Sequence, residues 1–327
     1  MKRSKASILL TAALAGMLTA SLATSASADS TPQPRDIVGV GSDTSEIVMN
    51  YLADGISLSG AFNPGFNATS NARVASFDAT GTATVVLKAG TAAITRPNGS
   101  GAGKALLYGA SSNTNANFAR SSSGPSTAEN SAGLWAVPYA LDGLKMATAT
   151  TSHAPASLTV AQLVQIYSGA VTNWNQVGGT SGTIVPMLPQ TGSGTRNFFL
   201  AQLKAANGGV DVTLAASVIS VQEHDSAPIA ASIDGVAPFS TARFATQATG
   251  IKLEGGFAAE RAIYNVVRAA DLSKSWFTAI FSADGSICSG GGQTLIAAAG
   301  FQQLAGPLDG GVCGVPTQVA TTNFAVN

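Results

Sequence analysis

The sequence predicts an α/β protein with mostly parallel sheets, and two observations lead to that fold class. Short apolar runs with the length of buried strands alternate with segments of helical spacing along the 327-residue chain. Glycine- and hydroxyl-rich turns follow several of the predicted strands, as expected where the crossovers of a parallel sheet begin. A chain of this length can form two lobes with separate cores.

The individual elements are predicted from apolar patterns and from the residues that bound them. Strands are expected at residues 36–40, 73–77, 117–120, 134–141, from 144 onward, 183–188, 218–221, 236–244 and 262–267. Helices are expected between residue 46 and Gly55, at 105–108, at 158–167, after the turn at 193–195, at 276–281 and at 294–304. The alternation holds over the whole length, which favours the α/β class over separate all-α and all-β domains.

The first 28 residues have the pattern of a secretory signal peptide. A basic start is followed by an apolar run at residues 8–22 and by Ala26-Ser27-Ala28, so cleavage is expected before Asp29. The apolar run is too short for a lasting membrane span. No cysteine lies near the cleavage site, so no lipid anchor is expected. The sequence predicts an exported protein that is soluble after cleavage.

Composition argues against polyanionic partners. Without the three basic residues of the signal peptide, 14 basic residues face 17 acidic ones, a net charge of about −3. Only 10% of the residues are charged, well below the usual share of about 25%. No nucleic acid and no anionic membrane surface is therefore an expected partner.

The cysteine and histidine counts limit the covalent and metal chemistry. Cys288 and Cys313 form an even pair in an exported chain and are expected to make one disulfide. It would close a loop that stabilises the fold by roughly 3 kcal/mol. The histidines, His153 and His224, do not cluster with the cysteines, so no metal site is expected.

The most informative stretch is the turn around residues 191–196. It lies between a predicted strand and an apolar helix, and Ser193 and Thr195 are both suitable helix N-caps. Free amides, hydroxyl donors and the positive end of a helix dipole bind small oxyanions, and Arg196 adds a positive charge. A single turn of this kind could equally be a capped connection that binds nothing.

Three other turns have the same character and favour the binding interpretation. They lie at residues 42–45, 98–103 and 121–124, each after a predicted strand. Ligands of parallel sheets bind at the carboxyl ends of the strands. All four turns are therefore expected to share one cleft.

Enzyme interpretations fail on motif details, so no enzyme and no cofactor are expected. A nucleotide-binding phosphate loop needs glycine and a hydroxyl residue where the chain has Asn98 and Ala105. The Gly-x-Ser-x-Gly elbow of serine hydrolases is missing around Ser193. His153 and His224 are both expected to be exposed loop residues.

With these turns identified, the chain resembles the phosphate-binding substrate-binding proteins of bacterial ABC transporters. The resemblance rests on Gly39-Val40-Gly41-Ser42-Asp43-Thr44, Asn98-Gly99-Ser100-Gly101-Ala102-Gly103, Phe118-Ala119-Arg120-Ser121-Ser122-Ser123-Gly124-Pro125, Gly192-Ser193-Gly194-Thr195-Arg196 and residues 158–175. The four motifs occur in the order that this family shows. The third motif has Ser121 or Ser122 where the family usually has an aspartate.

This resemblance implies a type II periplasmic-binding-protein-like clamshell that closes on an anion. It implies lobe 1 at residues 29–140 and 240–327, lobe 2 at 141–239, and extended crossovers near 138–144 and 236–244. The expected partners are inorganic phosphate or a similar oxyanion and the membrane subunits of an ABC transporter, and the protein is expected to be a monomer. The implied ligand-binding residues are Asp43, Thr44, Ser100, Ser121, Ser122, Ser193, Gly194, Thr195 and Arg196.

A second interpretation keeps the fold and changes its use. The altered third motif and the missing anchor also fit a secreted or envelope-associated protein that binds an organic ligand or serves as an interaction surface.

Overall fold

The computed structural model describes residue 29 and residues 31–327 of the chain, so the predicted signal peptide lies outside the described residues. A ten-stranded sheet organises the molecule, in the order β11-β10-β12-β8-β13-β7-β1-β4, with β14 beside β8 and β9 beside β13. These strands are β1 (Ile37–Gly41), β4 (Val74–Ser76), β7 (Phe118–Ser121), β8 (Leu134–Ala149), β9 (Ser157–Leu158), β10 (Val185–Pro189), β11 (Ile219–Val221), β12 (Gly235–Ser240), β13 (Ile251–Arg268) and β14 (Gln302–Gln303). The predicted α/β class is confirmed.

The two ends of the sheet are parallel and its middle is antiparallel. Strand β1 runs parallel to β4 and β7, and β10 runs parallel to β11 and β12. In the middle, β8 pairs antiparallel with β12 and β13, and β13 pairs antiparallel with β7. Short hairpins lie outside this sheet: β2 (Ile56–Leu58) with β3 (Ala61–Asn63), and β5 (Thr84–Val85) with β6 (Ile94–Thr95).

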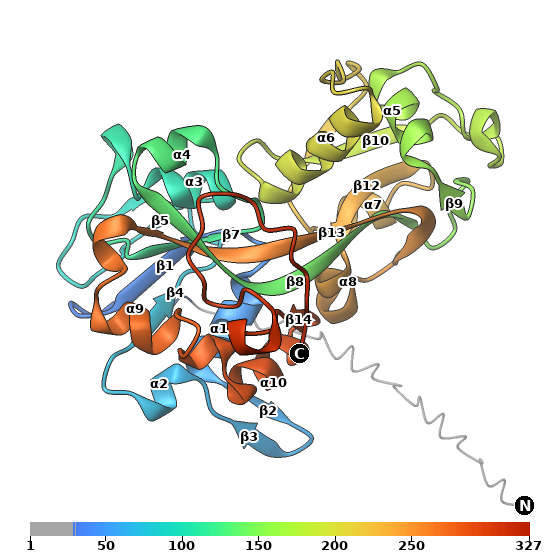
Figure 1. Ribbon diagram of the computed structural model, residues 1–327. Coiled ribbons are helices and arrows are strands. Elements are labelled where there is room, and N and C mark those ends of the chain that lie inside the picture. Colours follow the sequence, from blue (N-terminus) through green and yellow to red (C-terminus); the bar gives the residue numbers. More distant parts are fainter. Residues whose placement is uncertain (1–28, 30) are drawn as a thin grey trace, which may run out of the picture.

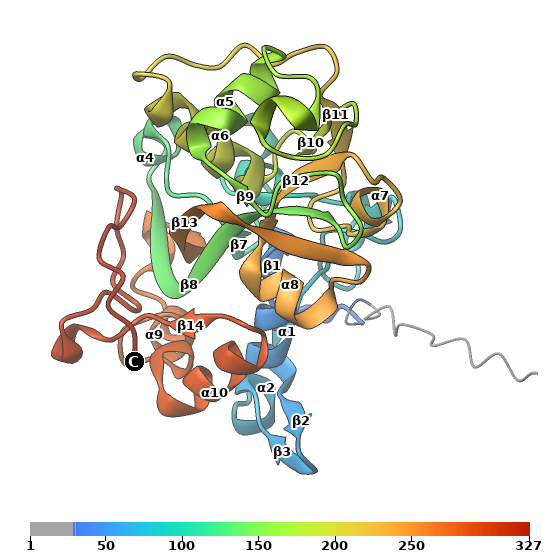
Figure 2. The ribbon, with the colours of Figure 1, turned by 90° about the vertical axis from the view of Figure 1, so that its right-hand side faces the viewer.

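The helices lie at both ends of the molecule, with α5 and α6 near one end and α1, α9 and α10 near the other (Figure 1, Figure 2). The α-helices are α1 (Glu46–Asp54), α2 (Phe66–Thr69), α3 (Ser100–Ala105), α4 (Thr127–Ser131), α5 (Val160–Ser168), α6 (Gly194–Ala206), α7 (Ala227–Ala230), α8 (Thr241–Gln247), α9 (Ser275–Ile280) and α10 (Gly290–Ala298). The 3-10 helices are η1 (Gly109–Ser111), η2 (Trp174–Val177), η3 (Ala269–Asp271), η4 (Ser286–Cys288) and η5 (Pro307–Asp309).

Local capping explains why several of these helices begin where the sequence predicts. At α5, the Thr159 hydroxyl accepts from the Gln162 amide while the Gln162 side chain accepts from the Thr159 amide, a capping box. Gly169 ends the helix in the left-handed conformation, with φ of 81°. Helix α3 differs from the prediction, because it begins at Ser100 inside the glycine turn and not at residue 105.

Two long neighbouring strands, β8 and β13, connect the two ends of the molecule (Figure 1). The first agrees with the crossover expected near 138–144. The second is at Ile251–Arg268, whereas residues 236–244 form most of β12 and the start of α8. The Ser240 hydroxyl accepts from the Arg243 amide, which caps α8 and ends the extended run.

The buried apolar residues form separate cores at the two ends. The largest cluster contains residues from 37–141 and from 242–313, for example Phe118 and Phe281. A second cluster contains residues from 144–257 and surrounds Trp174 and Phe199, both fully buried. A smaller third cluster around Phe239 also belongs to this part of the chain. The exact lobe boundaries stay a prediction.

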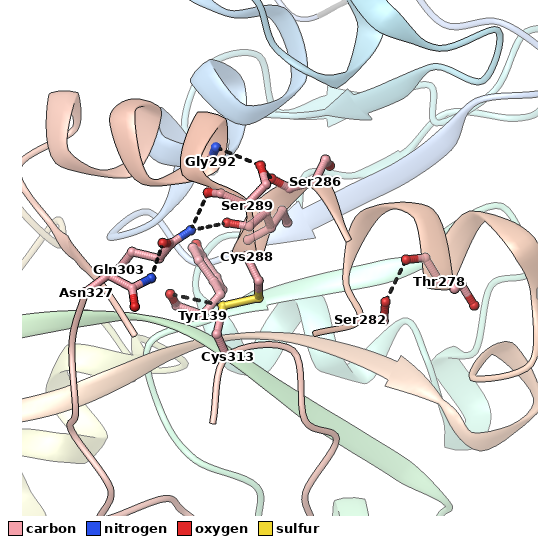
Figure 3. The surroundings of a disulfide bond; sticks show 11 residues. Tyr139, Thr278, Ser282, Ser286, Cys288, Ser289, Gly292, Gln303, Cys313 and Asn327 are labelled. Carbon is pink, nitrogen blue, oxygen red and sulfur yellow. Dashed lines mark hydrogen bonds between the residues drawn. A yellow bond between two sulfur atoms is a disulfide. The ribbon is translucent and has the colours of Figure 1, made fainter. Parts of the chain in front are cut away.

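The predicted disulfide joins Cys288 to Cys313 and ties the C-terminal segment to the larger core (Figure 3). Cys313 is fully buried, and its sulfur lies 3.9 Å from the Tyr139 carbonyl oxygen of β8. Nearby, the Gln303 side-chain amide donates to the carbonyl groups of Ile287 and Ser289. In the described part of the chain, no helix combines the length and apolarity that crossing a membrane requires.

Candidate functional site

The four hydroxyl-rich turns meet where the two ends of the molecule face each other. Thr44 Oγ1 lies 3.2 Å from Ser122 Oγ and 3.3 Å from Thr195 Oγ1. Ser122 Oγ is also 3.1 Å from Ser42 Oγ and 3.4 Å from Ser100 Oγ. We call these five fully buried residues, which span more than 150 positions of sequence, the hydroxyl cluster: Ser42, Thr44, Ser100, Ser122 and Thr195.

Each member is placed by the start of a helix or the end of a strand. Thr44 lies just before α1, Ser100 begins α3, and Ser122 follows β7. Thr195 lies in the first turn of α6, a 13-residue helix. The amides of Thr44 and Ser100 make no hydrogen bond to another described residue. The cluster therefore combines hydroxyl groups with amides at helix N-termini, which is the donor set that oxyanions bind.

The site has two sides, one formed by the part of the chain with β1, β7 and α3 and the other by the part with β10 and α6. Their backbones approach each other closely at this point. The Gly101 amide donates to the Gly192 carbonyl oxygen at 2.9 Å. A Cβ atom on Gly194 would lie 2.4 Å from the hydroxyl oxygens of both Ser100 and Ser122. Glycine is therefore required at position 194 for the turns to meet as they do.

Three side-chain amides, those of Asn98, Gln190 and Gln222, form hydrogen bonds next to the hydroxyl cluster. Asn98 Oδ1 accepts from Gln190 Nε2 at 2.7 Å and from Gln222 Nε2 at 3.2 Å. These contacts join the 98–103 turn to residues that follow β10 and β11. They hold the two sides together next to the hydroxyl cluster.

Several of the predicted binding residues lie beside the cluster and not in it. Ser121 Oγ donates to the Ser123 carbonyl oxygen, and Ser193 Oγ accepts from the Arg196 amide as the N-cap of α6. The Arg196 guanidinium donates to the Pro189 carbonyl oxygen at 2.9 Å. Asp43 faces Arg243, with 3.6 Å between Oδ1 and Nη2. The structure thus brings Thr44, Ser100, Ser122, Gly194 and Thr195 together.

Two residues that the sequence did not indicate reach the centre of the cluster. Glu223 Oε1 accepts from Thr44 Oγ1 and from the Thr195 amide, both at 3.1 Å. His224 Nε2 lies 3.0 Å from Thr44 Oγ1, and its ring packs edge-on against Phe239. The expectation that His224 is an exposed loop residue is wrong, because its side chain is fully buried. The other histidine, His153, is about one third exposed and pairs with Asp234.

Three buried arginines supply positive charge behind the cluster. Arg120 Nε donates to the Ser42 carbonyl oxygen, and Arg261 Nη1 donates to the Ser122 carbonyl oxygen. Arg243 lies 3.5 Å from Glu46 Oε1. Arg120 belongs to the third motif, but Arg243 and Arg261 had no local signal in the sequence. These guanidinium groups contact backbone carbonyl groups, carboxylates and, for Arg120, the Ser76 hydroxyl, and not the cluster hydroxyls.

Burial shifts the protonation equilibria around the site. It raises the pKa of Asp43 well above its usual range, against the opposing effect of Arg243, and it raises the pKa of Glu46. Burial lowers the pKa of Arg120. Burial also holds the pKa of His224 well below its usual range, with a further decrease from Arg243 and Arg261. A neutral imidazole therefore faces the hydroxyl cluster.

We predict that His224 makes the fold sensitive to acid. The unfolded chain takes up a proton near pH 6.5, whereas the folded protein does not, so lowering the pH favours unfolding. Below that pH, His224 removes about 1.4 kcal/mol of stability per pH unit. In His224→Gln the dependence of the unfolding free energy on pH should be smaller by this amount, as measured by urea denaturation at constant salt. Equal slopes in both proteins would show that buried His224 accepts a proton in the folded state.

The described residues contain no group of three or more His, Cys, Asp or Glu side chains that could hold a metal ion. The donors at the hydroxyl cluster are hydroxyl and amide groups, which suit an anion better than a cation. This donor set can bind an oxyanion.

Comparison with known proteins agrees with this fold. The family profile described as "PBP superfamily domain" matches residues 24–287. A protein from Clostridium perfringens, assigned as a phosphate ABC transporter substrate-binding protein and solved with bound phosphate, has a TM-score of 0.59 and 18% sequence identity, over 82% of this chain and 99% of that one. An ABC-type phosphate transport receptor from Vibrio cholerae has a TM-score of 0.54 and 20% identity, over 81% of this chain and 98% of that one. The search of curated proteins finds no significant relative.

Proposed function

Because the chain belongs to the PBP superfamily, we propose that it is an exported solute-binding protein that captures inorganic phosphate for an ABC transporter. One observation supports this most strongly: four turns distant in sequence bring their hydroxyl groups and helix N-termini to a single buried point. The phosphate proteins of similar fold described above agree with the choice of ligand.

In this proposal the phosphate oxygens accept hydrogen bonds from the hydroxyl cluster and from the amides at the starts of α1, α3 and α6. Each hydrogen bond to a charged group contributes about 1.5–3 kcal/mol. Four or five such bonds suffice for micromolar binding, about −8 kcal/mol, after the two sides have been ordered. Arg120, Arg243 and Arg261 add favourable potential from behind the turns.

The proposal concerns binding and release without covalent chemistry. Two lobes with separate cores would close on the ligand as a monomer, and the membrane subunits of the transporter would receive it. The predicted signal peptide would direct the chain out of the cytoplasm.

Removing hydroxyl donors tests this function directly. We expect Thr44→Val with Thr195→Val to weaken phosphate binding at least 100-fold, because two bonds worth about 3–6 kcal/mol together are lost. Isothermal titration calorimetry on phosphate-free protein measures the change. Valine has nearly the shape of threonine, so the variant should remain folded by circular dichroism.

The control is Thr246→Val, which removes an exposed hydroxyl that donates to the Ala242 carbonyl oxygen of α8. It should bind phosphate as the wild type does. If the double variant retained its affinity, phosphate would have to bind at another place on the molecule.

A further inference from the structure

The segment after β11 inserts a carboxylate into the hydroxyl cluster. Glu223 is fully buried, and its Oε1 atom accepts from the Thr44 hydroxyl and from the Thr195 amide. Its Oε2 atom is also buried and has no hydrogen-bond partner among the described residues. The backbone of Glu223 and the preceding residue are anchored, since the Glu223 amide donates to Gln190 Oε1 and the Gln222 side chain contacts Asn98.

The donors that hold Glu223 are those expected to hold an oxyanion. The Thr195 amide belongs to the first turn of α6, where the helix dipole favours negative charge. Thr44 lies at the start of α1 and donates its hydroxyl from the other side. A carboxylate and a phosphate present the same kind of charged acceptor oxygen, so both groups would use these donors. The carboxylate and the phosphate cannot use these donors at the same time, because two anions held by the same donors would lie close together and repel each other strongly.

Glu223 also connects the two sides of the site. Thr44 belongs to the part of the chain that contains α1 and β1, whereas Glu223 follows β11 in the part that contains the second core. The Thr44–Glu223 contact therefore spans the interface, as do the Gly101–Gly192 and Asn98–Gln190 hydrogen bonds. The carboxylate is the charged group among these contacts.

On the basis of the proposed function, we propose that Glu223 is an internal anion that competes with phosphate. In the ligand-free protein its carboxylate occupies the oxyanion position and holds the two sides together. Phosphate binds when Glu223 leaves. Glu223 is thus a residue that sets the affinity of the site by opposing its ligand.

The structure offers a place for the displaced side chain. A cavity of about 390 Å³ adjoins the cluster, and its lining includes Glu223, His224 and Arg243 together with the carboxyl groups of Asp43, Glu46 and Asp225. The Nε and Nη1 atoms of Arg243 are buried and have no hydrogen-bond partner among the described residues, so they are free to donate to a carboxylate that enters this cavity. His224 has φ of 57°, a left-handed conformation that is unfavourable for a residue other than glycine. A movement of this segment can relieve that conformation.

The decisive variant is Glu223→Gln, which keeps the shape and the Oε1 acceptor but removes the charge. We expect it to bind inorganic phosphate at least tenfold more tightly than the wild type, by calorimetry at one pH and one salt concentration. Glu260→Gln is the matched control, since it removes one negative charge from an exposed position on β13. It should change the affinity less than twofold.

Weaker or unchanged binding by Glu223→Gln would overturn the proposal. Weaker binding would mean that the carboxylate assists the ligand, for example by accepting its proton. A second measurement needs no ligand and separates this proposal from the proposed function. In phosphate-free buffer, Glu223→Ala should have a larger radius of gyration by small-angle X-ray scattering than the wild type, and Glu260→Ala should not.

If no protein of the series bound phosphate, the proposed function would fail, yet the scattering comparison would still test whether Glu223 holds the molecule closed. If Glu223→Ala kept the wild-type radius, the internal-anion proposal would be wrong even if phosphate bound to every variant.

Discussion

Gly194→Ala is expected to weaken phosphate binding roughly 10- to 100-fold without loss of fold. The added Cβ would lie 2.4 Å from both the Ser100 and the Ser122 hydroxyl oxygens, and 3.0 Å from the Ser122 backbone. Overpacking of this kind costs about 1–3 kcal/mol, and here it acts only when the turns meet. Calorimetry with inorganic phosphate measures the loss of affinity.

The stability of α6 gives an internal check on this result. Gly194 is the first residue of the helix, and alanine is a better helix former than glycine. The thermal transition should therefore stay within a few degrees of the wild type. Gly290→Ala is the matched control, because Gly290 is the first residue of α10 and has no atom within 4 Å of its added Cβ. Wild-type affinity in Gly194→Ala would mean that the ligand does not require the turns to meet.

Asp142→Ala is expected to destabilise the protein by about 3–5 kcal/mol, because it leaves a buried guanidinium without its partner. Asp142 is fully buried, and Arg261 is 3% exposed. The carboxylate accepts from Arg261 Nη2 at 2.8 Å and from Nε at 3.1 Å, and its other oxygen accepts from Ser240 Oγ at 2.7 Å. Urea denaturation measures the loss, and binding should also weaken because Arg261 positions the Ser122 carbonyl group.

Asp211→Ala is the control for this prediction. Asp211 also pairs with a cation, Lys204, but its side chain is 84% exposed. Ion pairs in water contribute about 0–1 kcal/mol, so this variant should keep almost all of its stability. Comparable losses in the two variants would contradict the assignment of the Asp142–Arg261 pair as a buried structural contact.

The parts of the site that depend on local sequence could be predicted. Ser193 caps α6, as expected, because capping uses atoms only three residues apart. The meeting of the turns after β1 and β7 also follows a general rule, since neighbouring parallel strands present their carboxyl ends along one edge. The turn after β10 belongs to a second group of parallel strands, and its approach to the first depends on the antiparallel pairing of β12, β8, β13 and β7. The positions of the charged groups were harder to predict, because the Arg196 side chain on α6 turns back to Pro189 at the end of the preceding strand, β10.

Residues that are positioned by long-range strand pairing had no local signal in the sequence. Glu223 and His224 lie in a short polar loop whose position depends on β11 pairing with β10. Arg261 lies in the middle of the 18-residue strand β13, of which the sequence indicated only residues 262–267. The glycines at 255 and 256 interrupt the apolar pattern of that strand, and its pairing with β8 also shifts register there, while the two glycines pair with β9. The positions of these residues therefore depend on tertiary contacts and could not be predicted from local sequence patterns.

The pairing of β8 with β13 also determines how the molecule can bend. If β8 and β13 were separate connections, the two ends of the molecule could rotate relative to each other. Because the two strands are hydrogen-bonded to each other, they must bend together. Their ladder shifts register in two places, between Leu253 and Ala258 and between Ile263 and Tyr264. The second shift lies opposite Tyr139, within the larger core and a few residues from where the second core begins. Bulges bend a strand locally, so we expect the two strands to bend at this point. Opening by hinging about one axis keeps the ladder intact, whereas a twisting motion would break its hydrogen bonds.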